Sequence, residues 1–191
     1  MFGVSWLKKQ QVDHILRAAG EISGDDQFII IGSQALHGKH PDLVDEFVMS
    51  AEVDLFAKNK SSATELLNAI GAGSQFHETF GYYADPVDEK TAVLPKGWKA
   101  RLVNLPAGNT NGVRGLCLDP HDLAISKYAA RREKDVTFTR ALAEHGLVVR
   151  ERLLELVAIT PVSPSRRELL RQFIEADFPS PPPPGKGLRK M

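Results

Sequence analysis

The chain has 191 residues, 42% of them hydrophobic and 25% charged, which is ordinary for one domain, or for one domain with a helical appendage. Lys and Arg number 24 and so do Asp and Glu, so the net charge predicts no general affinity for nucleic acids or membrane surfaces. The apolar runs are too short to cross a bilayer, and Met1–Lys9 lacks the apolar core of a secretion signal. The single cysteine excludes an internal disulfide and fits a reducing compartment, so we expect a cytoplasmic protein without membrane contact.

The first part of the chain predicts alternating helices and strands. Apolar residues at helical spacing predict a helix over 5–20, and a short β-branched run predicts a buried strand over Gln27–Ile31. A short helix then begins at Ser33, and the alternating segment Glu52–Phe56 is typical of a second strand. A serine pair with a glutamate three residues on predicts a capped helix over 61–70, ended by the following glycine.

The middle of the chain is rich in strand signals. We expect strands over Thr79–Ala84, Lys99–Leu105 and Val113–Leu118. Asn111-Gly112, just before the last of these strands, is a strong signal for a hairpin turn.

The last third of the chain predicts helices and a tail. Asp119-Pro120 combines a cap with a proline in the first turn, and predicts a helix that runs to about residue 131 or beyond. Three further helices are expected at roughly 133–145, 148–158 and 164–175. The whole pattern predicts an α+β fold: a mixed β-sheet flanked by helices over 1–118, a helical C-terminal region over 119–178, and a disordered Pro-rich tail over 179–191.

The first candidate site is a glycine and a serine at the end of the first strand. Gly32 lets the backbone approach a ligand closely, and Ser33 can donate its hydroxyl to a phosphate oxygen where backbone N–H groups point outward. The alternative is an ordinary turn between a strand and a helix.

The second candidate site is a pair of acids. Glu52 and Asp54 are two residues apart on a strand, so they share one face roughly 6–7 Å apart. Two partly buried carboxylates repel each other unless a cation lies between them, and hard oxygen ligands favour Mg²⁺ or Mn²⁺. An edge strand with a solvated acidic face is the alternative, but the preceding turn favours a site for a metal-bound nucleotide.

Gly32-Ser33 followed by Glu52-Val53-Asp54 resembles the nucleotidyltransferase superfamily typified by DNA polymerase β. The blocks FIIIGSQALHG, EVDLF, FGYYADPVDEKTAVLPKGWKARLVNL and LDPHDLAISKYAARREKDVTF are similar to a bacterial family of nucleotidyltransferase-like proteins, distantly akin to AbiEii-type toxins. The resemblance covers about residues 25–145. It implies a nucleotidyltransferase-like sheet, an NTP held by Gly32 and Ser33, and Mg²⁺ or Mn²⁺ held by Glu52 and Asp54.

This chain departs from the superfamily pattern in three ways. The first acid is Glu52 where the superfamily usually has Asp, and the gap from Ser33 to Glu52 is longer than usual. The third carboxylate, which in the superfamily lies on a later strand, is missing from Lys99–Leu105. Asp85 and Asp88 are the nearest alternatives, and the sequence does not place either of them in the site.

A third candidate site lies on the helix that begins at Pro120. If this helix continues, Lys127, Arg131 and Lys134 fall on one stripe and suit a triphosphate or an RNA backbone. The resemblance also implies Lys127 as a catalytic phosphate contact and Asp135 as a further nucleotide-binding residue. The alternative is a solvated charged face.

The leading hypothesis is a metal-dependent nucleotidyltransferase with Glu52, Asp54 and Lys127 as catalytic residues. By resemblance the acceptor is an RNA end (tRNA included) or a protein hydroxyl, and the setting is toxin–antitoxin or phage defence, with an antitoxin as partner. The competing hypotheses are a non-catalytic nucleotide-binding or protein-interaction module that has lost the third acid, and a structural subunit that binds no nucleotide.

Overall fold

The computed structural model describes residues 7–42, 47 and 50–178. The strands are β1 Gln27–Ile30, β2 Glu52–Ala57, β3 Tyr83–Pro86, β4 Val103–Asn104 and β5 Arg114–Cys117. The α-helices are α1 Lys9–Ser23, α2 Gln75–Phe80, α3 Pro120–Ala130, α4 Glu133–Glu144, α5 Arg150–Ala158 and α6 Pro164–Asp177. The 3-10 helices are η1 Ser33–Gly38, η3 Ser61–Ile70, η4 Glu89–Thr91 and η5 Trp98–Arg101.

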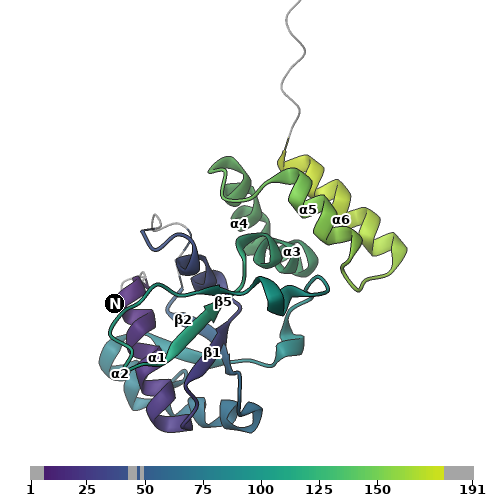
Figure 1. The fold of residues 1–191 in the computed structure, drawn as a ribbon. Coiled ribbons are helices and arrows are strands. Elements are labelled where there is room, and N and C mark those ends of the chain that lie inside the picture. The colour runs from purple at the N-terminus through teal and green to yellow at the C-terminus, as the bar shows by residue number, and fades with distance from the viewer. Residues whose placement is uncertain (1–6, 43–46, 48–49, 179–191) are drawn as a thin grey trace, which may run out of the picture.

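The five strands form one mixed sheet in the order β3-β2-β1-β5-β4. The central strand β1 pairs antiparallel with β2 and parallel with β5, and β2 pairs parallel with β3. Helices α3 to α6 gather beyond the end of the sheet toward which β5 points (Figure 1). The α+β class, with a mixed sheet and a helical C-terminal region, is therefore confirmed.

One face of the sheet is covered by α1. Gly115 on β5 lies so close to this helix that an added Cβ would be 2.9 Å from Leu16 Cδ1. Gly115 is paired with Phe28, and on the same side Ile30 is paired with Leu55. These apolar side chains are buried in the core. Because side chains alternate along a strand, Glu52 and Asp54 project from the opposite face.

The predicted start of the helix at Asp119-Pro120 is confirmed by α3. Asp119 caps the helix by accepting a hydrogen bond from the His121 backbone N–H at 2.9 Å, and Pro120 occupies the first turn. None of the helices in the described parts of the chain combines the length and apolar character needed to cross a membrane.

Two strand predictions in the middle of the chain are wrong in part. Thr79 and Phe80 belong to the helix α2, because the Ser74 hydroxyl caps its start and Gly81, with φ of 77°, ends it. The stretch predicted as a strand from Lys99 begins instead as the 3-10 helix η5, which follows Gly97 with φ of 76°. The Ser74 cap outweighs strand propensity at the first place, and the left-handed turn at Gly97 directs the chain into the 3-10 helix at the second.

The predicted hairpin is also only partly right. β4 and β5 do pair antiparallel, and Asn111 and Gly112 have the positive φ values of 53° and 82° that such a turn needs. They lie, however, within a longer loop that crosses α1, where Arg17 donates to the Asn109 carbonyl at 2.6 Å. The proposed tail over 179–191 lies outside the described residues, and the boundary between 1–118 and 119–178 stays a prediction.

Candidate active site

Three acids meet on the sheet face opposite α1. The register of β2 and β3 sets Asp54 beside Asp85 and Glu52 beside Tyr83. The Tyr83 hydroxyl donates to Glu52 Oε2 at 2.8 Å. Asp85 therefore supplies a third acid next to the pair that the sequence indicated. Asp88 does not join them: it is exposed and caps η4 by accepting from the Lys90 backbone N–H at 2.7 Å.

The Gly-Ser turn touches this acid cluster. A Cβ added to Gly32 would lie 1.7 Å from Asp54 Oδ2, so only glycine leaves room for this carboxylate. The backbone N–H of Ile31 also donates to the Asp54 carbonyl at 3.0 Å, which holds β2 beside the turn. The expected closeness of the acids and the Gly-Ser turn is confirmed.

Burial and neighbouring carboxylates raise the pKa values of two of these acids, Asp54 and Asp85. Burial raises the pKa of the Asp54 carboxyl to about 6, and the carboxylates of Glu52 and Asp85 act in the same direction while Lys127 and Lys134 oppose them. Burial and then the charge of Glu52 raise the pKa of Asp85 as well. A carboxylate cluster of this kind is electrostatically unfavourable without a nearby cation.

A cavity of about 250 Å³ opens beside Asp54 and Gly32. Its remaining walls come from the 91–93 segment, the second half of α3, and two arginines. Lys127 is the cation from α3, Arg132 lies just before α4, and Arg166 comes from the first turn of α6. The cavity thus has the Asp54 carboxylate at one side and three cations around it, an arrangement suited to a metal-bound polyphosphate.

The arrangement agrees with a comparison against family models. Residues 10–160 match the model of DUF6036, described as nucleotidyltransferase of unknown function. The chain belongs to this family. No curated protein and no solved structure matches the chain. Membership confirms a nucleotidyltransferase-like family, and such a protein is expected to bind an NTP.

No three acidic, histidine or cysteine side chains within the described residues stand ready as a metal site in this member of the DUF6036 family. Mg²⁺ is commonly held by one or two carboxylates together with substrate phosphates, so a complete protein cage is not required. The donor set at Glu52, Asp54 and Asp85 consists of the hard oxygen ligands that Mg²⁺ and Mn²⁺ prefer.

The predicted stripe of cations is wrong. Helix α3 ends at Ala130, and Arg131 adopts a left-handed conformation with φ of 54°. The Arg131 guanidinium then lies 3.8 Å from the centre of the Phe173 ring on α6, and it does not line the cavity. A new helix starts at once because Asp135 accepts a hydrogen bond from the Arg132 backbone N–H at 3.1 Å.

The remaining predicted residues have distinct positions. Lys127 lines the cavity, and its Nζ lies 3.5 Å from Asp135 Oδ1. Asp135 is 1% exposed and also lies 3.4 Å from the Arg132 Nε, so it orients both cations from behind. Lys134 is exposed in the first turn of α4, near enough to lower the pKa of Asp54.

Sequence reasoning missed Arg132 and Arg166 as parts of the site. Arg132 precedes the predicted site residues Lys134 and Asp135 in the stretch RREKD, so the sequence does contain a signal for it. Arg166 has none, because only the tertiary fold brings α6 to the end of α3. There the Arg166 guanidinium donates to the Ala129 carbonyl at 2.6 Å.

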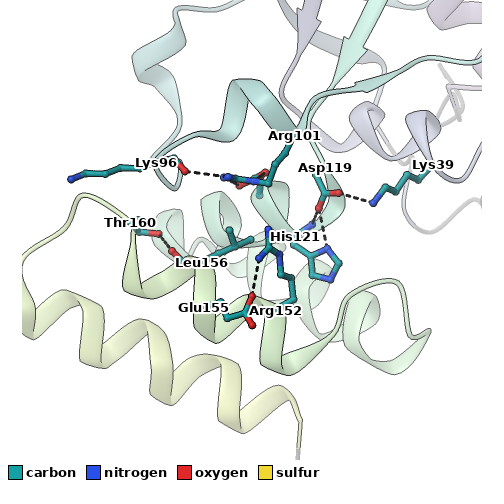
Figure 2. A network of polar contacts seen from close by, with 10 residues as sticks. Lys39, Lys96, Arg101, Asp119, His121, Arg152, Glu155, Leu156 and Thr160 are labelled. Atoms are coloured by element: carbon teal, nitrogen blue, oxygen red, sulfur yellow. Dashed lines mark hydrogen bonds and ion pairs between the residues drawn. The ribbon is translucent and has the colours of Figure 1, made fainter.

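A polar network fixes the start of α3, and with it the position of Lys127. Figure 2 shows Asp119 between Lys39 and His121; it accepts from the Lys39 Nζ at 2.6 Å and lies 3.0 Å from His121 Nδ1. These contacts hold the pKa of Asp119 well below its usual range. The His121 ring in turn accepts from the Val149 backbone N–H at 3.0 Å. The network connects α3 to the segment after η1 and to the start of α5.

Proposed function

We propose that this protein is a metal-dependent nucleotidyltransferase that moves a nucleoside monophosphate from an NTP to a hydroxyl acceptor. The observation that carries the proposal is the direct contact between Gly32 and the Asp54 carboxylate, with Asp85 on the neighbouring strand. It joins a turn suited to phosphates to acids suited to a cation, on one face of one sheet.

Glu52, Asp54 and Asp85 would hold Mg²⁺ or Mn²⁺. Their crowding on one face and the raised pKa values of Asp54 and Asp85 support this, since a divalent cation would relieve the repulsion. When bound, the cation would polarise the phosphoryl oxygens and neutralise charge that develops in the transition state.

Gly32, Ser33, Lys127, Arg132 and Arg166 would hold the triphosphate. Lys127 and the two arginines surround the cavity next to Asp54, and charged donors bind phosphate oxygens more strongly than neutral ones. Asp135 would keep Lys127 and Arg132 in position through its two carboxylate oxygens. Lys134 would add a more distant favourable charge, and Arg131 has no part in the proposed site.

The chemistry is an in-line displacement at the α-phosphorus. The acceptor oxygen forms a bond to phosphorus as the bond to the β-phosphate oxygen breaks, and pyrophosphate leaves with the electron pair. Asp85, whose pKa burial raises, would take the proton from the attacking hydroxyl.

The non-catalytic module was motivated by the lack of a third acid on the strand near residue 101. Asp85, which is paired with Asp54 on β3, would supply that acid, and this supports the enzyme over the module. The turn and acid strand further support a place in the DNA polymerase β-like superfamily. The kinship with AbiEii-type toxins, and with it a toxin–antitoxin setting, rests on the resemblance in sequence alone.

The test compares wild type with Asp54→Asn and Asp85→Asn. Each is incubated with Mg²⁺ or Mn²⁺, each α-³²P-labelled NTP in turn, and total RNA or total protein from a cell extract. Transfer of label by wild type, with a loss of at least about a hundredfold in Asp54→Asn, supports the proposal. Nucleotide binding without transfer to any acceptor would favour the module, and a flat thermal-shift response to every NTP with Mn²⁺ would favour the structural subunit.

A further inference from the structure

A second and larger cavity, of about 990 Å³, lies on the same sheet face as the acids. Its floor includes Phe56, two residues beyond Asp54 on β2. Ile29 and Leu116, which are neighbours of Phe56 across the sheet, complete that floor. Residues two apart on a strand lie about 7 Å from each other, so this cavity begins within one side chain's reach of the acids.

The 86–93 segment runs between the two cavities. Residues 86–90 line the larger cavity and residues 91–93 line the smaller one. Asp85 directly precedes this segment. Along the strands, Ile31 and Asp54 belong to the smaller cavity, whereas Ile29 and Phe56 belong to the larger. Asp54 and Asp85 therefore lie between the cation-lined cavity and the larger one.

This geometry separates the leaving group from the acceptor. If the phosphates occupy the cation-lined cavity, pyrophosphate leaves on that side of the acids. In-line displacement requires the attacking oxygen to approach from the opposite side, which is the side of the larger cavity. Asp85 lies at that boundary, where a carboxylate can accept the proton of the attacking hydroxyl.

The charges of the larger cavity indicate the kind of acceptor. Its lining contains Lys58, Lys90 and Lys99, balanced by three acids, Glu65, Asp88 and Glu89. Lys99 is paired with Glu89 at 2.8 Å, and the Lys58 Nζ donates to Gln27 Oε1 at 2.8 Å. An RNA end carries a phosphate at every nucleotide and needs an excess of cations, which this lining lacks. An apolar floor with a polar rim, whose positive and negative charges balance, is instead typical of surfaces that bind peptides.

We propose that the larger cavity binds the acceptor and that the acceptor is a hydroxyl-bearing segment of a protein. This inference rests on the proposed function and names its second substrate. In the reaction, the Ser, Thr or Tyr oxygen of that segment bonds to the α-phosphorus, pyrophosphate leaves, and the hydroxyl proton passes to Asp85.

The test narrows the cavity without touching the phosphate site. Ser61 is exposed on η3 and lines the larger cavity, whereas its neighbour Ser62 is equally exposed and does not. Ser61→Trp therefore blocks the cavity, and Ser62→Trp is the matched control. Asn68 also lines the cavity, and its neighbour Ala69 does not. Asn68→Trp with Ala69→Trp as its control therefore repeats the test in case Ser61→Trp fails to fold.

Two acceptor preparations separate the possible outcomes: total protein freed of nucleic acid, and total RNA freed of protein, each with α-³²P-labelled NTPs and Mn²⁺. We expect label in protein only, with transfer reduced at least about tenfold by Ser61→Trp and unchanged in Ser62→Trp. The affinity for NTP, measured by calorimetry, should stay within about twofold of wild type in both variants.

Three results would overturn the inference while leaving the proposed function intact. The first is label found in RNA only, and the second is full transfer to protein by Ser61→Trp and Asn68→Trp. The third is a loss of NTP affinity in these two variants, because that loss would place the nucleoside in the larger cavity. A wild-type protein that labels neither preparation refutes the proposed function, and the inference with it.

Discussion

At the scale of single residues, Gly32 and Asp54 depend on each other. The Asp54 carboxylate occupies the space that any other side chain at position 32 would need. This explains the glycine without reference to a turn, because the φ of Gly32 is −85° and is open to every residue type. The glycine is there for the approach of a carboxylate.

Gly32→Ala should therefore displace Asp54. The added methyl group overlaps Oδ2, so we expect a loss of about 1–3 kcal/mol in the free energy of unfolding and loss of Mn²⁺-dependent NTP binding. Urea denaturation and calorimetry measure the two effects. Gly71→Ala is the control, since its Cβ would meet the Asn68 backbone at 3.2 Å, a tight contact without the overlap found at Gly32, and it should retain NTP binding. Normal NTP binding in Gly32→Ala would contradict the proposed site.

The raised pKa of Asp54 predicts a pH effect on stability. Because its folded pKa is about 6, above the ordinary 3.8, the folded state favours the protonated carboxyl. Its contribution to stability is thus present below about pH 4 and lost as pH rises to 6. Asp54→Asn should remove this loss and be more stable than wild type at pH 7, by up to about 3 kcal/mol. Urea denaturation from pH 4 to 7 measures the difference, and a difference that does not change with pH would contradict the prediction.

At the scale of elements, the junction between α3 and α4 decides which cations reach the site. The sequence predicts one helix to about residue 131 or beyond and another from about 133, but it does not say whether the first continues through the junction and aligns Lys127, Arg131 and Lys134. The structure breaks the helix at Arg131, where stacking on Phe173 and the contact between Arg132 and Asp135 outweigh the strain of a left-handed arginine. Local sequence does not contain the contact that turns Arg131 away from the site, since Phe173 belongs to α6.

The two arginines at this junction should behave differently. Arg132→Ala should weaken NTP binding about tenfold, because Arg132 lines the cation-lined cavity. Arg131→Ala should leave NTP binding unchanged and lower the free energy of unfolding by about 1 kcal/mol, through loss of stacking on Phe173. Calorimetry measures NTP binding and urea denaturation measures stability in both variants. Weaker NTP binding in Arg131→Ala than in Arg132→Ala would instead indicate that Arg131 faces the phosphates, as in the predicted stripe.

The two lysines of the same region give a graded prediction. Lys127 lines the cavity and is the foremost charge lowering the pKa of Asp54, whereas Lys134 is exposed and comes last among the causes. Lys127→Ala should therefore weaken NTP binding more than Lys134→Ala does. Titration with NTP and Mn²⁺ at two salt concentrations measures both, and the larger effect at Lys134 would place the triphosphate nearer α4.

At the scale of the whole molecule, features that depend on local interactions could be predicted from the sequence, and features that depend on long-range contacts could not. The buried strand at 27–30, the acid strand and the helix start at Asp119 depend on local patterns, and the sequence indicates each of them. Asp85 and Arg166 enter the site only through strand register and helix packing, which link distant parts of the chain. The sequence therefore predicts the chemistry of the site better than it predicts which residues form the site.

The sheet and the helical region are joined by a buried ion pair. Arg101 on η5 donates twice to Asp122 on α3, at 2.8 and 2.7 Å, and Asp122 is fully buried. Arg101 also donates to the Lys96 carbonyl, as Figure 2 shows. Because α3 carries Lys127, this pair contributes to the geometry of the site as well as to stability.

Removing one member of this pair should cost more than removing both. Arg101→Ala leaves an unpaired buried carboxylate, so we expect a loss of about 3–5 kcal/mol in the free energy of unfolding, whereas the double variant Arg101→Met with Asp122→Leu should recover most of it. Lys99→Ala, which breaks an exposed pair with Glu89, should cost less than about 1 kcal/mol. Urea denaturation of the four proteins gives these differences. Equal losses of unfolding free energy in Arg101→Ala and Lys99→Ala would mean that the ion pair does not hold the sheet and the helical region together. The position of Lys127 would then have to depend on the Asp119 network alone.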